Sequence, residues 1–532
     1  MDSKFSFGKI QFDVSLGSQA ARARRDPEAP FGLAVLGDFS GRANRGLREP
    51  IGQRRIWRVD CDNLDHVISK LDASLRLPLS SRSGPPPDAN PPAAPTADLH
   101  FPSLEHFHPD QFLKQVAPLA ALVERRQRLL NPSTALAAAS ELQTLLTHQP
   151  AQSPAAAPPP GGTTPALADD DVRAPAESDA DTLARLLGGA PQRPAPPARP
   201  PTGIAVERLI QNIVAPSIVA GVTPQQTALL SVLDLELTAR LRSILHHPEF
   251  QALEASWRSL DLLVRAFGGE ENLNLFLLDV SKAELAVDLK AHDQLEESGI
   301  CKLIQRQADD QPWAAWLGLF TFADTVADVE MLGRLAKVSA LVGAPFIASA
   351  GPALVSCDSF DAHPDPDDWK QPLPTEVREA WQALRELPET AYLGLAQPRF
   401  LLRQPYGKDS ELIEAFPFEE LPADLPHESY LWGNPAVVCG YLLAQAFQAE
   451  GWEIQAAGYG ELGDLPVHKF KQEGETTVKP GAEAWLSERA AEAIRQKGLM
   501  PLLSIKGRDA VRLAGMQSLR SPACPLTGRW TG

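Results

Sequence analysis

The sequence of 532 residues has few cysteines, and none is placed to form a zinc ribbon or a redox pair. Its five cysteines lie far apart, and no two of them have CxxC spacing. An odd number of scattered thiols is typical of a reduced, cytosolic protein, so we expect free thiols rather than a disulfide framework. The cysteines are Cys61, Cys301, Cys357, Cys439 and Cys524.

Long hydrophobic runs are also missing. No stretch reaches the roughly 18 apolar residues that a membrane-spanning helix requires. The first residues, Met1 to Val14, have neither the apolar segment nor the small-residue cleavage site of a secretion signal. We therefore expect a cytoplasmic chain that is not inserted in a membrane.

Basic residues are in deficit, with 50 Lys and Arg against 67 Asp and Glu, which gives a formal net charge of −17. A protein that binds duplex nucleic acid needs a basic surface to displace counterions from the phosphates. This charge balance disfavours nucleic acid as the partner.

Proline, in contrast, is abundant, and it is concentrated in two segments. Residues 84–97 (GPPPDANPPAAPTA) have the composition of a loop insertion. Residues 150–203 are rich in Pro and Ala and cannot bury enough apolar surface to offset their ordering entropy, which predicts a disordered or polyproline-like tether. The tether would separate an N-terminal module, residues 1–149, from a C-terminal module, residues 204–532.

The N-terminal module has the pattern of an α+β fold. Alternating apolar residues from Lys9 to Leu16 predict a half-buried strand. The apolar run 31–36 predicts a buried strand that ends in a Gly-Asp turn, and residues 55–59 predict another strand. Apolar residues at helical spacing predict a helix over 110–130.

The C-terminal module has the pattern of an α/β fold. A helical stretch over 228–266 contains Pro248, which should divide it into two helices. Apolar runs at 273–280, 316–322 and 344–350 predict buried strands, and the segments 283–295 and 324–342 between them predict helices. Strands that are apolar throughout indicate a sheet covered on both faces.

No segment has the pattern of a catalytic or cofactor site. Residues 458–463 (GYGELG) match GxGxxG but are not followed by a helix start, and there is no Walker or GxSxG motif. The pair His246-His247, the segment 106–110 (HFHPD) and the segment 363–368 (HPDPDD) lack the partners of a metal site, so we interpret them as helix starts and turns. We expect no metal and no cofactor.

Two arginines leave two interpretations open. Arg399 and Arg403 flank the apolar residues 400–402 and could together clamp an anion. Alternatively, they form buried ion pairs with Glu419 or Glu420.

A family resemblance lies in several motifs of the C-terminal module. Residues 244–260 (ILHHPEFQALEASWRSL) resemble the signature of the large sheath subunit of bacterial type VI secretion systems, the TssC family. The segments 343–347 (GAPFI), 394–407 (GLAQPRFLLRQPYG), 416–420 (FPFEE), 430–434 (YLWGN) and 498–502 (GLMPL) follow in the family's order.

The N-terminal module is similar to the small sheath subunit, the TssB family. The similarity lies in residues 35–41 (VLGDFSG), 58–60 (RVD) and 101–110 (FPSLEHFHPD). The whole chain thus resembles a fusion of two sheath subunits joined by the tether.

The resemblance implies a structural protein and no enzyme. In that family the two subunits polymerise into a helical sheath around a tube of Hcp protein, and contraction of the sheath drives the tube out of the cell. It implies four partners: other sheath chains, the Hcp tube, baseplate components and a ClpV-type AAA+ ATPase that disassembles the contracted form. The family's large subunit also continues further than Gly532 does, so a non-polymerising accessory or adaptor protein with a sheath-like fold is the alternative.

The motifs carry over a set of residues with a structural role. We also expect the alternating segment near the N-terminus to donate a strand to a neighbouring subunit, or else to pair within its own module. The candidate donated strand contains Ile10, Phe12, Val14 and Leu16. The structural motif residues are Gly37, Asp38, Phe39, Pro109, His246, Pro248, Phe250, Leu253, Glu254, Trp257, Arg258, Pro345, Phe346, Pro398, Arg399, Phe400, Arg403, Pro405, Tyr406, Trp432, Gly433 and Asn434.

Overall fold

The computed structural model describes most of the chain. It covers residues 5–10, 28–79, 96–147, 223–308, 312–422, 424–454, 460–472 and 474–531. The predicted tether, most of the Pro-rich segment 84–97, Gly458 and three residues of the candidate donated strand (Phe12, Val14 and Leu16) lie outside these ranges.

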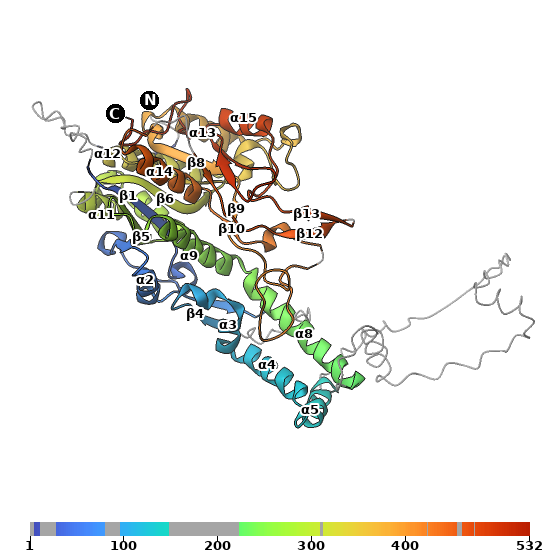
Figure 1. The fold of residues 1–532 in the computed structure, drawn as a ribbon. Coiled ribbons are helices and arrows are strands. Elements are labelled where there is room, and N and C mark those ends of the chain that lie inside the picture. Colours follow the sequence, from blue (N-terminus) through green and yellow to red (C-terminus); the bar gives the residue numbers. More distant parts are fainter. Residues whose placement is uncertain are drawn as a thin grey trace, which may run out of the picture. The chain divides into compact units, whose positions relative to one another are not determined.

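The described helices and strands follow one another along two stretches of chain (Figure 1). The first stretch contains β1 (Phe31–Gly37), α1 (Arg42–Arg45), β2 (Trp57–Val59), α2 (Leu64–Leu71), β3 (Ser74–Pro78), β4 (Thr96–His100), α3 (Pro109–Gln115), α4 (Ala117–Leu130) and α5 (Ala135–Thr147). The second contains α8 (Pro224–Leu245), α9 (Pro248–Phe267), β5 (Leu273–Asp279), α10 (Lys282–Ala291), α11 (Gly299–Ala308), β6 (Trp313–Phe322), α12 (Val326–Val342), β7 (Phe346–Ala350), α13 (Thr375–Glu386), β8 (Leu393–Gln397), β9 (Phe400–Leu401), β10 (Trp432–Gly433), α14 (Ala436–Glu450), β11 (Glu461–Leu462), β12 (Lys469–Gln472), β13 (Glu475–Val478), α15 (Glu488–Gln496), β14 (Met500–Ser504) and β15 (Val511–Leu513).

A nine-stranded sheet organises the larger compact unit, which comprises residues 1–123 and 234–532. The strand order is β11-β15-β14-β8-β7-β6-β1-β5-β2. Neighbours from β14 to β5 pair in parallel, whereas β15, β11 and β2 pair antiparallel at the edges. The α/β expectation for the C-terminal module is therefore confirmed.

Strand β1 occupies an internal position in this sheet. It pairs in parallel with β5 in a register that runs from Phe31 opposite Leu273 to Gly37 opposite Asp279, and its other edge pairs with β6. All seven of its residues are buried. β1 and β2 of the N-terminal segment thus belong to the sheet of the C-terminal segment, whereas β3 and β4 form a two-stranded antiparallel sheet of their own.

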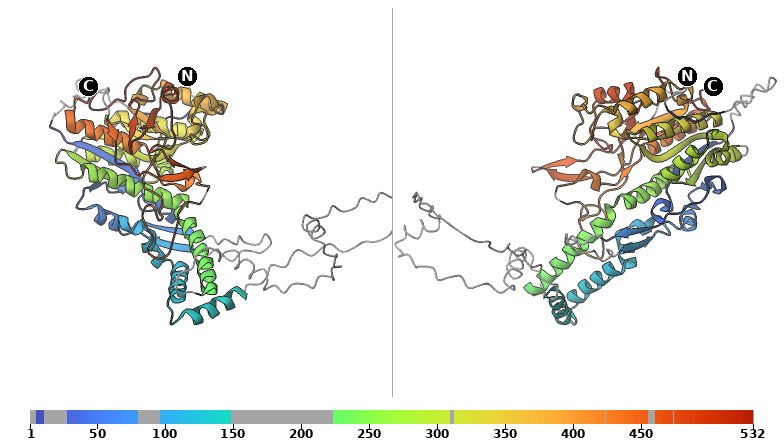
Figure 2. Two further views of the ribbon diagram at one scale, coloured as in Figure 1. Left: turned by 45° about the vertical axis from the view of Figure 1, so that its right-hand side comes forward. Right: turned by 180° about the vertical axis from the view of Figure 1, so that it is seen from behind.

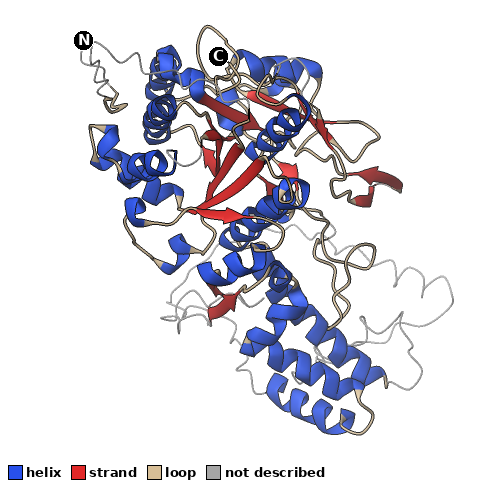
Figure 3. Cartoon of the chain, turned by 60° about the vertical axis from the view of Figure 1, so that its left-hand side comes forward, coloured by secondary structure: helices blue, strands red, loops and turns tan. Residues whose placement is uncertain are grey.

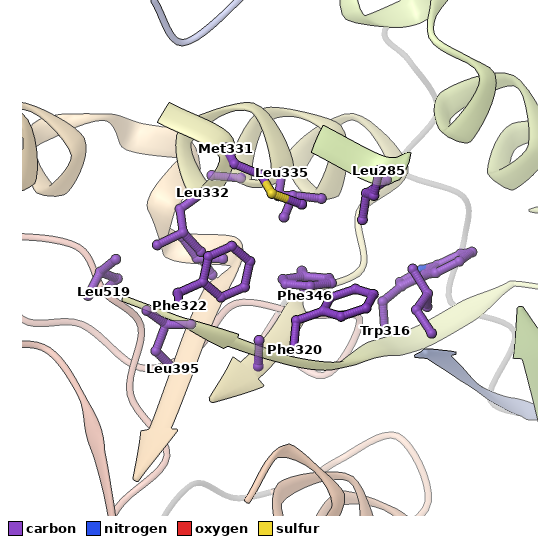
Figure 4. Packing of buried hydrophobic residues seen from close by; sticks show 14 of the residues in the cluster. Leu285, Trp316, Phe320, Phe322, Met331, Leu332, Leu335, Phe346, Leu395 and Leu519 are labelled. Carbon is purple, nitrogen blue, oxygen red and sulfur yellow. The ribbon is translucent and has the colours of Figure 1, made fainter. Parts of the chain in front are cut away.

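Helices cover both faces of the sheet (Figure 3). Successive residues of β6 show this arrangement: Leu317 contacts Gly440 of α14, whereas Trp316 faces the opposite side and belongs to a large apolar cluster. In that cluster Met331 of α12 lies over Phe346 and its neighbours on the sheet (Figure 4). The two-sided cover explains why the strands are apolar throughout.

The N-terminal residues 5–10 lie against α12. Phe7 is buried, and a β-carbon on Gly333 of α12 would lie 2.2 Å from its ring, so Phe7 requires a glycine there. Arg334 donates from Nη2 to Ser6 Oγ at 2.8 Å, and Lys9 forms an isolated bridge with Gln294. Residues 5–10 therefore contact the C-terminal half of the same chain.

Proline fixes the start of two helices. Pro109 and Pro248 are the first residues of α3 and α9, and the imidazole of the preceding histidine accepts the N–H of Asp110 or Glu249 at 3.3 Å. The predicted break at Pro248 is confirmed. The predicted helix 110–130 is interrupted at Val116, and helix α11 was not predicted at all.

A smaller compact unit comprises residues 124–233. Among its described residues, Leu129, Ala138, Leu142, Leu229 and Leu233 are buried. Arg128 Nη2 lies 3.1 Å from Glu141 Oε2, which links α4 to α5. This unit is helical wherever its residues are described as regular structure.

Candidate functional site: the joint between the two halves of the chain

We use the term joint for the contact surface, inside the larger unit, between residues 28–123 and residues 234–531. Its polar centre is Asp279, the last residue of β5. The Asp279 carboxylate accepts the backbone N–H groups of Phe39 at 2.9 Å and Ser40 at 3.2 Å, and the Ser40 hydroxyl at 2.7 Å. Arg42 Nη1 donates to the same carboxylate at 3.0 Å. One carboxylate of the second half therefore holds the turn that follows β1.

A second carboxylate, Glu284 of α10, extends these contacts. It accepts Nε–H of Arg42 at 3.2 Å and is also paired with Arg54. Both arginine side chains are nearly fully buried, with exposures of 8% and 4%. The Arg54 hydrogen bond and the nearby charges lower the pKa of Glu284 despite its burial. The joint therefore contains charge pairs that would be unpaired if the halves separated.

Asp38, which begins the same turn, caps α1. Its carboxylate accepts the N–H groups of Arg42 at 2.7 Å and Ala43 at 2.9 Å. Burial, together with the neighbouring Asp279, raises the pKa of Asp38. Among the motif residues of the first half, Gly37, Asp38 and Phe39 all lie at this joint.

Aromatic side chains form the apolar part of the joint. Trp257 of α9 donates its indole N–H to the carbonyl of Phe39 at 2.8 Å, and the two rings meet edge to face at 5.0 Å. Phe250, about two turns earlier on α9, packs against Phe107 and Phe112 at 6.0 and 5.7 Å. One face of α9 thus contacts two separate segments of the first half.

A buried ionic network surrounds Arg403. Arg403 Nε lies 2.8 Å from Glu254 of α9, and Nη1 lies 2.6 Å from Glu420. The three side chains are 7%, 0% and 2% exposed. Glu254 also pairs with Arg258 at 2.7 Å, and Glu420 accepts the N–H of Tyr406 at 2.7 Å. The ion pair with Glu420 was one of the two sequence alternatives, whereas the pairing with Glu254 had no signal in the sequence.

Arg399 has other partners than the sequence suggested. It is paired with Glu483 and, at 2.9 Å, with Glu428, and not with Glu419 or Glu420. His427 Nε2 lies 2.9 Å from Glu483. His427, Glu428 and Glu483 have the spacing of metal ligands, but Arg399 already supplies positive charge to both carboxylates. The geometry therefore favours ion pairs over a metal ion.

Two carboxylates in these networks make stability depend on pH. Burial alone would raise the pKa of Glu420 and Glu483, but Arg403 for the first, and His427 with Arg399 for the second, lower both pKa values to about 2. Because the folded-state pKa lies below the unfolded value, their stabilisation is present above about pH 4.5 and is lost as the pH falls towards 2.

We therefore expect the midpoint of urea unfolding to fall steeply below pH 4.5, and Glu420→Gln to flatten that dependence while lowering stability at pH 7. Urea titrations at several pH values would check this. If the urea midpoint fell equally steeply with pH in Glu420→Gln and in the parent protein, Glu420 would not be a source of the pH dependence.

A cavity of about 680 Å³ lies where β1 and β6 end, which is the usual ligand position of an α/β sheet. Its cationic side chains are already engaged: Lys282 Nζ lies 2.7 Å from Asp328, and Arg399 is paired as described. Asn434 accepts the N–H of Ala436 at 3.0 Å and donates to the carbonyl of Phe320 at 3.1 Å. This cavity therefore offers no free charged group to a ligand.

The remaining motif residues take structural positions in the second half. Phe400 pairs with Gly433 in the short sheet of β9 and β10, where Trp432 donates its indole N–H to the carbonyl of His427. The carbonyl of Pro345 accepts the N–H of Trp316 at 2.8 Å, at the start of β7. His246 Nε2 lies 3.6 Å from Glu420. The buried members include Leu253, Phe346, Phe400 and Tyr406, while Pro398 and Pro405 flank the two arginines.

All five cysteines are free thiols. None of the helices that the structure describes is both long enough and apolar enough to cross a bilayer.

The fold and the joint define a class: an α/β protein in which two sequence segments share one sheet and bury their charges against each other. Comparisons with known proteins agree with this class. Residues 227–520 match the VipB family (EvpB/VC_A0108, tail sheath N-terminal domain), and residues 9–154 match the family described as Type VI secretion system, VipA, VC_A0107 or Hcp2. The chain belongs to the VipB tail sheath family, and it carries a VipA segment in front, as expected of a TssB–TssC fusion.

One curated relative is the type VI secretion system sheath protein TssC1 of Pseudomonas aeruginosa. It is 34% identical to this chain over 306 residues, which are 56% of this chain and 61% of the relative. The alignment thus spans less than two thirds of the relative's length.

Proposed function

We propose that the chain is a fused protomer of a contractile type VI secretion sheath. It polymerises around a tube of Hcp protein in the bacterial cytoplasm and contracts to drive effector delivery. The observation that carries this proposal is the position of β1: the small-subunit segment supplies an internal strand to the sheet of the large-subunit segment. A single chain can therefore build the unit that two subunits build elsewhere in the family.

Physical arguments support a filament made from such a unit. A contact between unlike surfaces that does not close into a ring produces an open helical polymer. Contraction is then a change between two packings of the same protomers. A tether between the halves fixes their ratio at one to one and keeps them at high effective concentration.

We extend the proposal to the partners and to the motif residues. Other sheath chains, the Hcp tube, baseplate components and a ClpV-type ATPase are the proposed partners. The motif residues act through packing and charge pairing, as at Asp279 and Arg403, and we assign the chain no catalytic role.

Negative-stain electron microscopy of the purified full-length protein, alone and with the cognate Hcp, tests the proposal. We expect long hollow tubes with cogwheel-shaped ends. Monodisperse particles at high concentration in the presence of Hcp would contradict it, and would favour a non-polymerising accessory or adaptor protein with the sheath fold. A variant with Asp in place of Leu33, in the middle of β1, serves as the control that should form no tubes.

A further inference from the structure

A second cavity, of about 520 Å³, lies away from the joint on one side of α13. Five residues of α13 line it at helical spacing, so they share one face of that helix. Further lining comes from Ser356, from Lys497 at the end of α15, and from Ser521. The helix residues are Arg378, Trp381, Gln382, Arg385 and Glu386.

The cavity collects positive charge without matching negative charge. Within the described residues, the side chains of Arg378 and Lys497 lie in no ion pair, although the chain as a whole carries a net charge of −17. One acidic residue, Glu386, lines the cavity, and its carboxylate accepts the Gln382 side-chain N–H at 3.2 Å.

Arg385 is the most buried of these cations. Its guanidinium donates from Nε to the carbonyl of Leu519 at 3.0 Å, and no carboxylate among the described residues pairs with it. Burial lowers the pKa of Arg385. A half-buried guanidinium of this kind would gain from an anion that replaces the water it has lost.

Trp381 provides an independent observation. Its side chain lines the same cavity and is only 6% exposed, yet its buried indole N–H has no hydrogen-bond acceptor in the structure. Buried tryptophan N–H groups usually find an acceptor, because an unmade hydrogen bond costs about 1–3 kcal/mol. Because this N–H group is itself buried, the Trp381 ring, and not its N–H group, is what the side chain offers to a ligand in the cavity.

We propose that this cavity binds a small molecule with phosphate or carboxylate groups. Arg378, Arg385 and Lys497 neutralise its charge, and the side chain of Trp381 lies beside it. Guanidinium groups suit such anions because they can donate two parallel hydrogen bonds. The volume is within the usual range of small-molecule sites. The proposal does not depend on sheath assembly.

Isothermal titration calorimetry of the full-length protein at low ionic strength tests this site, with pyrophosphate and citrate as separate probes. We expect saturable binding of one or both, and the comparison tells whether phosphate or carboxylate is preferred. The double variant Arg378→Gln/Arg385→Gln should bind at least tenfold more weakly. Arg489→Gln, an exposed arginine of α15 that pairs with Asp365 and Asp367 away from the cavity, should bind as the parent protein does.

Thermal melting of each variant separates lost binding from lost folding. Should the double variant unfold, Arg378→Gln alone decides, because this exposed side chain makes no hydrogen bond or ion pair with the described residues. No saturable binding of either probe would overturn the proposal. Equal binding by the parent and by a folded Arg378 variant would overturn it as well.

Discussion

A chain cut between residues 150 and 203 should remain a single complex. β1 is held on both edges, by β5 and β6, and its turn is held by Asp279, so the cut leaves every described contact of the joint in place. A protease site inserted in this segment, followed by cleavage and gel filtration, should give both fragments in one peak. They should separate only in denaturant.

The matched control carries the same protease site together with Leu33→Asp. Leu33 is fully buried in β1, so an aspartate there places a charge without a partner inside the sheet. We expect this variant to aggregate or to release its two fragments after cleavage. If the cleaved protein without the Leu33 substitution also released its fragments, the joint would be too weak to hold the two halves together without a covalent connection. That result would contradict the prediction drawn from the pairing of β1.

Replacing Arg403 should destabilise the protein strongly. Arg403→Met leaves Glu254 and Glu420 as buried carboxylates that have lost their shared partner. Breaking a buried pair in this way typically costs about 3–5 kcal/mol, far more than the pair contributes relative to an apolar replacement. Urea unfolding at pH 7 should show a loss of that size.

Arg489→Met provides the exposed comparison. Arg489 is 58% exposed and pairs with Asp365 and Asp367 at the surface, where such pairs contribute about 0–1 kcal/mol. The double variant Arg403→Met/Glu420→Gln should recover part of the loss, because it removes the buried carboxylate that has lost its arginine, whereas Glu254 keeps Arg258 as a partner. If Arg403→Met lowered the free energy of unfolding no more than Arg489→Met does, the ionic network around Arg403 would not be buried as described.

Local patterns in the sequence predicted local structure. The apolar run at 31–37 predicted a buried strand, and the residues before Pro109 and Pro248 predicted helix boundaries. These features depend on neighbouring residues, through side-chain periodicity and the fixed φ of proline. The interruption at Val116 was missed because the apolar spacing continues across it.

Long-range pairing was not predictable in the same way. Nothing in the run 31–37 says that its partners are β5 and β6, since any apolar strand could flank it. The ion pairs show the same limit: Glu420 lies 17 residues from Arg403 and was named as a candidate, whereas Glu254 lies 149 residues away and was not. For Arg399 the nearby glutamates were the wrong partners, because the fold brings Glu483 close instead.

The position of β1 has a consequence for how the protein is made. Phe31 pairs with Leu273, which the ribosome adds 242 residues later. At about 5–20 residues per second, the newly made strand waits roughly 12–50 seconds before its first partner emerges. During that interval a wholly apolar strand is present in the nascent chain without either of its neighbours, so synthesis is the stage at which this protein is most exposed to aggregation and most dependent on chaperones.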